Sequence, residues 1–271
     1  MSRIDEELRR TLGLDEVEKL PGGGVLECYW VMAGGAQRFL KTGPAKYADL
    51  LGAEADGLAA LRAAGVRAPE AFASGSAGRQ AYLLIEHLEL HTSGDFRALG
   101  TMLAALHRTT GPRFGWARDN FIGPTPQQNG WSDDWAEFWI EKRMNPQFAL
   151  AEKNGFHLEK PDLFKLLKDH KPQPSLLHGD LWSGNAGFSD GQPVIFDPSV
   201  YYGDREADVA MTELFGGFPR EFYASYDEAF PLPEGYSARK NLYNLYHLLN
   251  HLNIFGGGYL AQVKATLGLL R

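Results

Sequence analysis

Cysteine is nearly absent from the sequence: Cys28 is the only one among 271 residues. A single cysteine excludes an internal disulfide and any metal site built from several thiolates. We therefore expect Cys28 to be a small residue within a strand, with a reactive thiol as the alternative.

Long apolar runs are also absent. No uninterrupted apolar stretch reaches the roughly 18 residues that a membrane-spanning helix requires. The first residues, 1–7, are polar and acidic, unlike a signal peptide. These two absences favour a soluble, cytoplasmic protein with no membrane partner.

Basic residues are also fewer than acidic ones. Lys and Arg total 27 against 34 Asp and Glu, which gives a formal net charge of -7. Such a chain repels the phosphates of nucleic acid, so we expect no nucleic-acid partner. Repeats and low-complexity tracts are missing too, which disfavours a solenoid or a long linker. A hydrophobic content of 44% is enough to build a core of one large or two modest domains.

The predicted secondary structure changes from β-rich to mostly helical about a third of the way along the chain. Residues 21–86 contain a glycine-rich turn, two β-rich segments at 25–33 and 37–41, a helical pattern, and a third apolar strand at 82–85. After Leu88 the pattern is mostly helical, interrupted only at residues 175–197. This predicts an α+β, bilobal fold with a small β-rich N-terminal lobe, residues 1–88, and a larger, mainly helical C-terminal lobe, residues 89–271.

The helical pattern at residues 46–64 carries one acidic residue on its apolar side. Glu54 falls on the stripe formed by Tyr47, Leu51, Leu58 and Leu61. A buried carboxylate is costly without a cation, and Lys41 at the end of the preceding strand could supply one. We expect an ion pair between Lys41 and Glu54, the alternative being that Glu54 sits at the edge of the stripe and reaches water.

Two apolar runs in the larger lobe each end in an acidic residue, Asp180 and Asp197. Phosphoryl transfer needs a carboxylate that orients the attacking hydroxyl, and oxygen ligands that hold Mg²⁺ against the phosphates. Asp180 and Asn185 have the spacing of the base and metal ligand in the catalytic loop of protein kinases. Asp197 then stands in the place of the second metal-binding Asp, although Pro198 and Ser199 replace the usual Phe-Gly.

An Asp and an Asn five positions apart are common in turns, so this spacing alone is weak. Here it follows a glycine-rich turn and the Lys41–Glu54 pair in the order that a kinase requires, which predicts ATP and Mg²⁺ as cofactors. The missing long activation segment disfavours a regulated protein kinase. The predicted nucleotide-binding residues are Gly22, Gly23, Gly24, Lys41, Glu54, Glu86 and Leu88.

Several further motifs make a closer resemblance visible. They occupy residues 119–127, 178–185, 196–199, 201–208, 214–219 and 245–256. With these motifs the chain resembles the fructosamine/ketosamine 3-kinase family, relatives of the aminoglycoside phosphotransferases and choline kinases, over residues 22–259. The resemblance implies a protein-kinase-like fold and ATP-dependent phosphorylation of the O3 hydroxyl of ketosamines or glycated amines. The 3-phosphate then eliminates and frees the amine.

The resemblance also implies roles for individual residues. It makes Asp180 the catalytic base, Asn185 and Asp197 the Mg²⁺ ligands, Lys41 a phosphate contact, Glu54 its positioning partner, and Trp182 a wall beside the sugar. An aromatic face suits the C–H groups of a polyol, but Trp182 could instead be a packing residue between the lobes. Some family members link chains through a Cys after the glycines, and this chain has Val25 there.

Other residues that could carry chemistry favour structural roles. We expect His178 to brace backbone carbonyls. His247 and His251 have zinc-ligand spacing but no adjacent Glu and no third ligand, so we expect a core helix. Asp208 precedes an apolar helical run and could cap that helix, brace the catalytic loop, or do both. The aromatic stripe of Trp131, Trp135, Phe138 and Trp139 is typical of a core.

Two other functions remain open at the level of sequence. The chain could phosphorylate another small alcohol, such as an aminoglycoside or choline, or it could be a nucleotide-binding pseudokinase. Retention of the complete set of predicted phosphoryl-transfer residues argues against the pseudokinase. We expect a monomer rather than an obligate oligomer.

Overall fold

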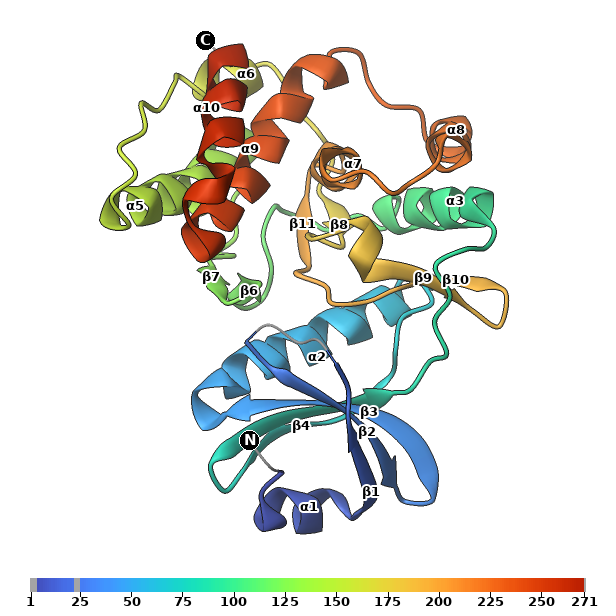
Figure 1. Ribbon diagram of the computed structural model, residues 1–271. Coiled ribbons are helices and arrows are strands. Elements are labelled where there is room, and N and C mark those ends of the chain that lie inside the picture. The colour runs from blue at the N-terminus through green and yellow to red at the C-terminus, as the bar shows by residue number, and fades with distance from the viewer. Residues whose placement is uncertain (1–3, 22–24, 271) are drawn as a thin grey trace.

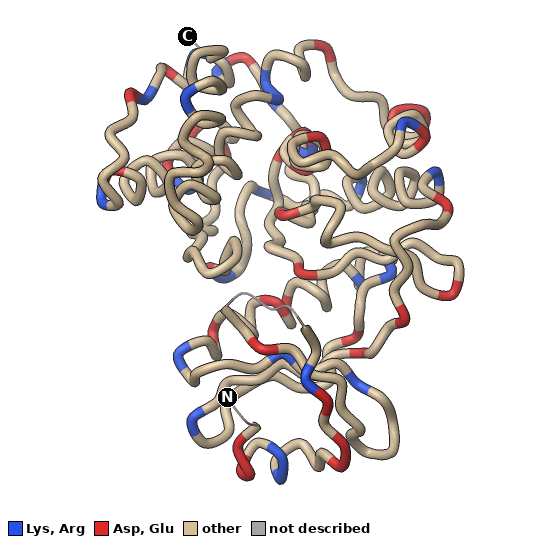
Figure 2. The backbone as a smooth tube through the Cα atoms, viewed as in Figure 1, with Lys and Arg blue, Asp and Glu red and all other residues tan. Residues whose placement is uncertain are grey.

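The computed structural model describes residues 4–21 and 25–270. Within them the chain forms two lobes, a sheet with one long helix and a larger helical body (Figure 1). The α+β, bilobal arrangement expected from the sequence is confirmed. Residues 87–95 connect the lobes, and the boundary after Leu88 remains our proposal. Acidic and basic residues are interspersed over both lobes (Figure 2).

The small lobe is built on a five-stranded sheet in which all neighbouring strands are antiparallel. Its strands in spatial order are β1 (Leu14–Lys19), β2 (Glu27–Ala33), β3 (Ala36–Pro44), β5 (Gln80–Glu86) and β4 (Ala71–Ala77). The three strands predicted from the sequence correspond to β2, β3 and β5. Strands β1 and β4, which form the two edges of the sheet, were not predicted from the sequence.

One long helix covers the sheet. After α1 (Glu6–Leu12) and the short turn η1 (Ala45–Tyr47), helix α2 spans Ala48–Ala63, close to the predicted range. Its apolar stripe packs on the sheet: Leu51, Leu58 and Leu61 are fully buried in one cluster with Leu83 of β5. Burial of these leucines determines which face of α2 is turned toward the sheet and its strand β3.

The larger lobe is mainly helical. Its helices are α3 (Phe96–His107), α4 (Trp135–Trp139), η2 (Ile140–Met144), α5 (Asn145–Lys153), α6 (Phe164–Leu167), η3 (Ser183–Asn185), α7 (Glu206–Leu214), α8 (Arg220–Ala229), α9 (Tyr236–Phe255), η4 (Gly257–Tyr259) and α10 (Leu260–Leu269). Helix α9 lies at the centre of the core, where Trp135, Phe138 and Trp139 are buried as expected. Trp131 is 40% exposed, so its assignment to the core was wrong. No helix of the described segments has the length and apolar character to cross a bilayer.

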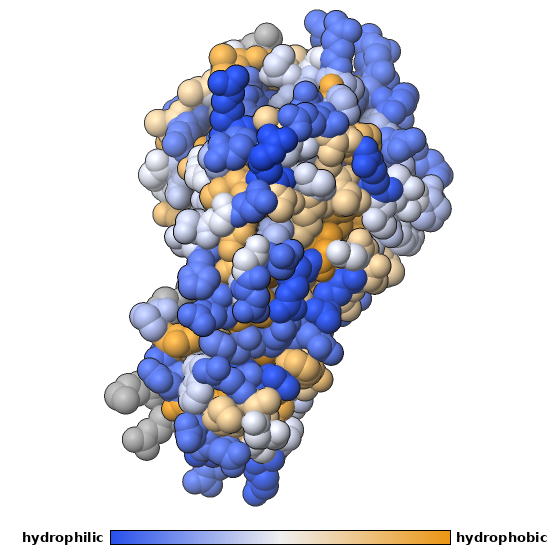
Figure 3. Space-filling view, turned by 90° about the vertical axis from the view of Figure 1, so that its right-hand side faces the viewer, coloured by the Kyte–Doolittle hydropathy of each residue, from blue (hydrophilic) through white to orange (hydrophobic). Residues whose placement is uncertain are grey.

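Short strands line the border of the larger lobe that faces α2 (Figure 1). They form three pairs, β6 (Asn120–Ile122) with β7 (Thr125–Gln127), β8 (Ser175–Leu177) with β11 (Tyr201–Gly203), and β9 (Ala186–Ser189) with β10 (Gln192–Ile195). These pairs hold residues 178–185 and 196–200 at the border of the larger lobe. On the face shown in Figure 3 hydrophilic residues dominate, and hydrophobic residues gather in a strip on the upper, larger lobe.

Candidate active site

A cavity of about 660 Å³ lies between the lobes. Every predicted site residue that the structure describes contributes to its lining. They are Lys41, Glu54, Glu86, Leu88, Asp180, Trp182, Asn185 and Asp197. The predicted glycines Gly22, Gly23 and Gly24 lie outside the described residues, in the connection between β1 and β2.

Lys41 of β3 is held by two carboxylates. Its Nζ lies 2.7 Å from Glu54 Oε1 and 2.6 Å from Asp197 Oδ1. The side chains of Lys41 and Glu54 are only 10% and 11% exposed, so the expected ion pair is confirmed and the water-exposed alternative for Glu54 is wrong. Burial lowers the pKa of Lys41, but the carboxylates of Asp197 and Glu54 outweigh burial and raise that pKa overall. Lys41 therefore stays a cation.

The β9–β10 hairpin brings Asn185 and Asp197 together. Asn185 precedes β9, Asp197 follows β10, and the backbone N–H of Phe196 donates to the carbonyl of Asn185 at 3.0 Å. The amide nitrogen of Asn185 donates to the carbonyl of Asp180 at 2.9 Å, which directs the amide oxygen away from that bond. Asp197 has a left-handed backbone, φ 58°, and a side chain 44% exposed. An amide oxygen and a carboxylate at one hairpin end fit the oxygen ligands that Mg²⁺ prefers.

Asp208 braces the backbone ahead of Asp180. Its carboxylate accepts the N–H of His178 at 2.7 Å and the N–H of Gly179 at 2.8 Å, and its Oδ2 lies 3.1 Å from His107 Nε2. Asp208 is 2% exposed and sits inside the first turn of α7, whose cap residue is Arg205. The loop-bracing interpretation is therefore confirmed, and the helix-cap interpretation is wrong.

His178 performs the structural role expected of it. Its Nε2 donates to the carbonyl of Phe196 at 2.9 Å, and its Nδ1 accepts the N–H of Asp180 at 3.2 Å. Burial lowers the pKa of His178, which favours the neutral ring that this pattern requires. Gly179 beside it has φ 84°, and a Cβ there would lie 2.2 Å from the carbonyl oxygen of Ser199. Only glycine fits this position.

Asp180 occupies an environment that opposes its charge. Its side chain is 22% exposed, and burial, then Asp197 and Asp208, raise its pKa to about 7. A carboxylate with a pKa near neutrality can both accept a proton and release it, which suits a general base.

The wall of the cavity next to Asp180 is aromatic. Trp182 is 40% exposed, and its ring lies over Gly184, where a Cβ would come within 2.2 Å of the ring. Phe255, at the end of α9, lines the same cavity and is 66% exposed. Sequence reasoning missed Phe255, because an aromatic residue at the end of an apolar helix gives no signal of exposure.

Of the predicted nucleotide-binding residues, Glu86 ends β5 and Leu88 follows that strand, and both line the cavity. The carboxylate of Glu86 already receives two hydrogen bonds from Arg67, both at 2.8 Å. A nucleotide contact by that carboxylate would have to compete with Arg67.

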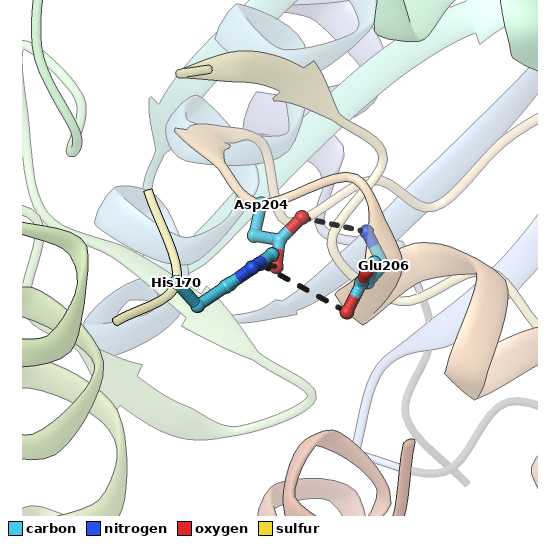
Figure 4. Close-up of side chains that lie close together, drawn as sticks. All are labelled: His170, Asp204 and Glu206. Atoms are coloured by element: carbon cyan, nitrogen blue, oxygen red, sulfur yellow. Dashed lines mark hydrogen bonds and ion pairs between the residues drawn. The ribbon is translucent and has the colours of Figure 1, made fainter. Parts of the chain in front are cut away.

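Two other groups that contain histidine lie outside the residues that line the cavity, and each includes a histidine engaged in a hydrogen bond. His251 Nδ1 donates to the backbone carbonyl of His247 at 2.8 Å, and His247 is 3% exposed, as expected for a core position. His170, Asp204 and Glu206 form a second cluster, which the sequence did not reveal (Figure 4). All four of its carboxylate oxygens accept hydrogen bonds. The donors are His170, Tyr243, Arg239 and the N–H of Glu206. The cluster is a polar network of the interior.

Comparisons with known proteins agree with this geometry. The sequence model of the family described as "Fructosamine kinase" matches residues 1–270. A "probable ketoamine kinase" of Synechocystis is 42% identical, covering 97% of this chain and 94% of the relative. A crystal structure of a candidate fructosamine-3-kinase from Haemophilus somnus superposes with a TM-score of 0.91 at 31% identity, covering 98% and 96% of the two chains. An aminoglycoside phosphotransferase in complex with ADP and hygromycin B shares the fold, with a TM-score of 0.64 at 16% identity over 97% and 95%.

Proposed function

Because the chain belongs to the fructosamine kinase family, we propose that it uses ATP to phosphorylate the O3 hydroxyl of ketosamines such as fructosamine or ribulosamine. Family membership makes the chain a phosphotransferase that acts on a sugar hydroxyl. The ketosamine acceptor, the O3 position and the deglycation that follows are the proposal. Its main support is that Asp180, Trp182 and the Lys41–Asp197 pair line one cavity.

The proposed reaction follows from these positions. The O3 oxygen of the sugar attacks the γ-phosphorus, its proton passes to the carboxylate of Asp180, and the bond to the β-phosphate oxygen breaks to release ADP. Lys41 holds phosphate oxygens, and Glu54 keeps its ammonium in place. Asn185 and Asp197 would hold Mg²⁺, which neutralises charge on the phosphates when it is bound. Elimination of the 3-phosphate from the product then frees the amine.

Trp182 would define the acceptor. Two residues after the base, its exposed ring offers a flat apolar wall against which sugar carbons can pack while the hydroxyls remain hydrogen bonded. Because an aromatic face also attracts quaternary ammonium groups, choline must be compared with the ketosamine directly.

The test is a side-by-side measurement of kcat/KM for a ketosamine, an aminoglycoside and choline, with the phosphorylated position identified by NMR. We expect the ketosamine to give the highest value and O3 to carry the phosphate. A higher kcat/KM for choline or an aminoglycoside, or phosphate on another sugar hydroxyl, would refute the ketosamine assignment.

A Trp182→Ala variant tests the sugar wall. We expect it to raise KM for the ketosamine on the order of tenfold or more while nucleotide affinity changes little, since substrate binding is lost away from the phosphates. Trp131→Ala is the matched control, because Trp131 is equally exposed at 40% but stacks on Tyr202 away from the cavity lining. Equal effects of the two substitutions would contradict a role for Trp182 in substrate binding.

A further inference from the structure

His247 is a buried polar side chain without a partner beside the candidate base. It lies on α9, is 3% exposed, and its ring atom Nδ1 makes no hydrogen bond to the described residues. Leaving a buried donor or acceptor unpaired is destabilising, so such an atom in a folded protein calls for an explanation. Solvent does not supply the partner, because Nδ1 has no appreciable accessible surface.

The nearest carboxylate to this atom belongs to Asp180. His247 Nδ1 lies 3.9 Å from Asp180 Oδ1, about 1 Å longer than a charge-assisted N–H···O bond. The terminal torsion of an aspartate side chain is soft, so a small rotation of the carboxylate can close this gap. Hydrogen bonds at active sites are often long without substrate and shorten in the substrate complex.

The protonation state of His247 suits a donor. Burial, and then the neighbouring His251, lower the pKa of His247 to about 3, so the ring is neutral at physiological pH. A neutral imidazole carries one N–H and one acceptor nitrogen. If Nδ1 were the acceptor, its lone pair would face the oxygen of Asp180. The tautomer with the proton on Nδ1 avoids that repulsion.

We propose that His247 is a positioning residue: its Nδ1–H donates to Oδ1 of Asp180 in the substrate complex and leaves Oδ2 directed at the acceptor hydroxyl. The proposal rests on the proposed role of Asp180 as the base. It explains why a polar ring occupies a core position of α9, where leucines would otherwise suffice.

The test compares two substitutions at His247. His247→Asn keeps an N–H donor at the same number of bonds from the backbone as Nδ1, whereas His247→Leu fills the space without a donor. We expect Leu to lower kcat about 10- to 100-fold, the change that one charge-assisted hydrogen bond supports, with KM for both substrates little changed. Asn should restore most of the lost kcat. His170→Leu, which removes a half-buried histidine of the separate Asp204–Glu206 cluster, should leave kcat unchanged.

Each outcome decides the proposal. Wild-type kcat in His247→Leu, or an equal loss of kcat in the Leu and Asn variants, would overturn it.

If the wild-type protein does not phosphorylate ketosamines, the proposed function fails, and the same comparison of variants is made on the rate of Mg-ATP hydrolysis without an acceptor. If the variants do not fold, NMR of wild-type protein labelled with ¹⁵N-histidine decides: a protonated Nδ1 on His247 with Mg-ATP bound supports the proposal, and an unprotonated Nδ1 overturns it.

Discussion

The raised pKa of Asp180, which suits a general base, reduces the stability of the folded protein as pH increases. Burial together with Asp197 and Asp208 raises its pKa to about 7, far above the usual value for an aspartate. The folded protein therefore holds a proton on Asp180 at pH values where the unfolded chain has already released it. A raised carboxyl pKa costs stability as pH increases, the opposite of a salt-bridged aspartate.

Asp180→Asn should remove this cost. Below pH ~4 the carboxyl is protonated in both states, so the charge effect vanishes there. Between pH ~4 and 7 the stability of the wild type relative to the variant should fall by up to about 1.4 kcal/mol per pH unit and then level off. The measurement is the difference in unfolding free energy between the two proteins, without nucleotide or metal, from pH 4 to 8.

The same substitution should reduce kcat on the order of 10² to 10⁴, the usual contribution of a general base, with Mg-ATP binding retained. A stability difference independent of pH would show that Asp180 is not held in its proton-bearing form. Near-normal kcat would remove Asp180 from the role of base.

At the scale of elements, α2 determines where Asp197 lies. Gly57 in the middle of this helix faces Pro198, the residue after Asp197. A Cβ on Gly57 would lie 2.9 Å from Pro198 Cγ and 3.5 Å from Val200 Cγ1. Glycine weakens a helix interior, so its presence here reflects this close approach.

Alanine substitutions at two glycines of α2 should therefore have different effects on kcat and on stability. Gly57→Ala should push Pro198 away, displace Asp197, and lower kcat on the order of tenfold or more. Gly52→Ala meets only Arg118 Nη1 at 3.8 Å, an ordinary contact, and should raise stability by about 0.5–1 kcal/mol with unchanged kcat. Steady-state kinetics and denaturant unfolding of both variants check this, and full activity in Gly57→Ala would refute the close-packing argument.

The sequence predicted those elements whose pattern is local. Apolar periodicity located α2 and placed Glu54 on its buried face, and strands β2, β3 and β5 followed from their β-rich composition. Strand β4 (Ala71–Ala77) was missed because it consists largely of alanine, serine and glycine, and β1 because charged residues dominate it. The pairing of Lys41 with Asp197 was also beyond prediction, since it depends on how two lobes face each other.

At the scale of the whole molecule, Lys41 joins three elements from both lobes: β3, α2 and the end of the β9–β10 hairpin. Asp197 thus has one observed partner, the Lys41 ammonium, and one proposed partner, Mg²⁺. In the nucleotide-bound enzyme it would have to share its two oxygens between them.

Asp197→Ala should therefore abolish the part of ATP affinity that depends on Mg²⁺, and lower kcat by ~10³, the several kcal/mol that a metal ion contributes. Titration calorimetry of ATP with Mg²⁺ and with EDTA measures the first effect. Asp190→Asn is the control, since Asp190 is exposed in the turn at the opposite end of the same hairpin. Unchanged Mg-ATP affinity in Asp197→Ala would rule out the metal-ligand assignment.

The position of Cys28 has a practical consequence. This only thiol of the chain lies opposite Lys41 in the β2–β3 pairing and lines the interlobe cavity. A fluorophore or a covalent fragment attached there would sit beside the nucleotide without any engineered mutation, and its emission would report occupancy in real time. Burial raises the pKa of the thiol, so attachment is slow at neutral pH and faster in alkaline buffer, and a bound nucleotide would shield the sulfur from the reagent.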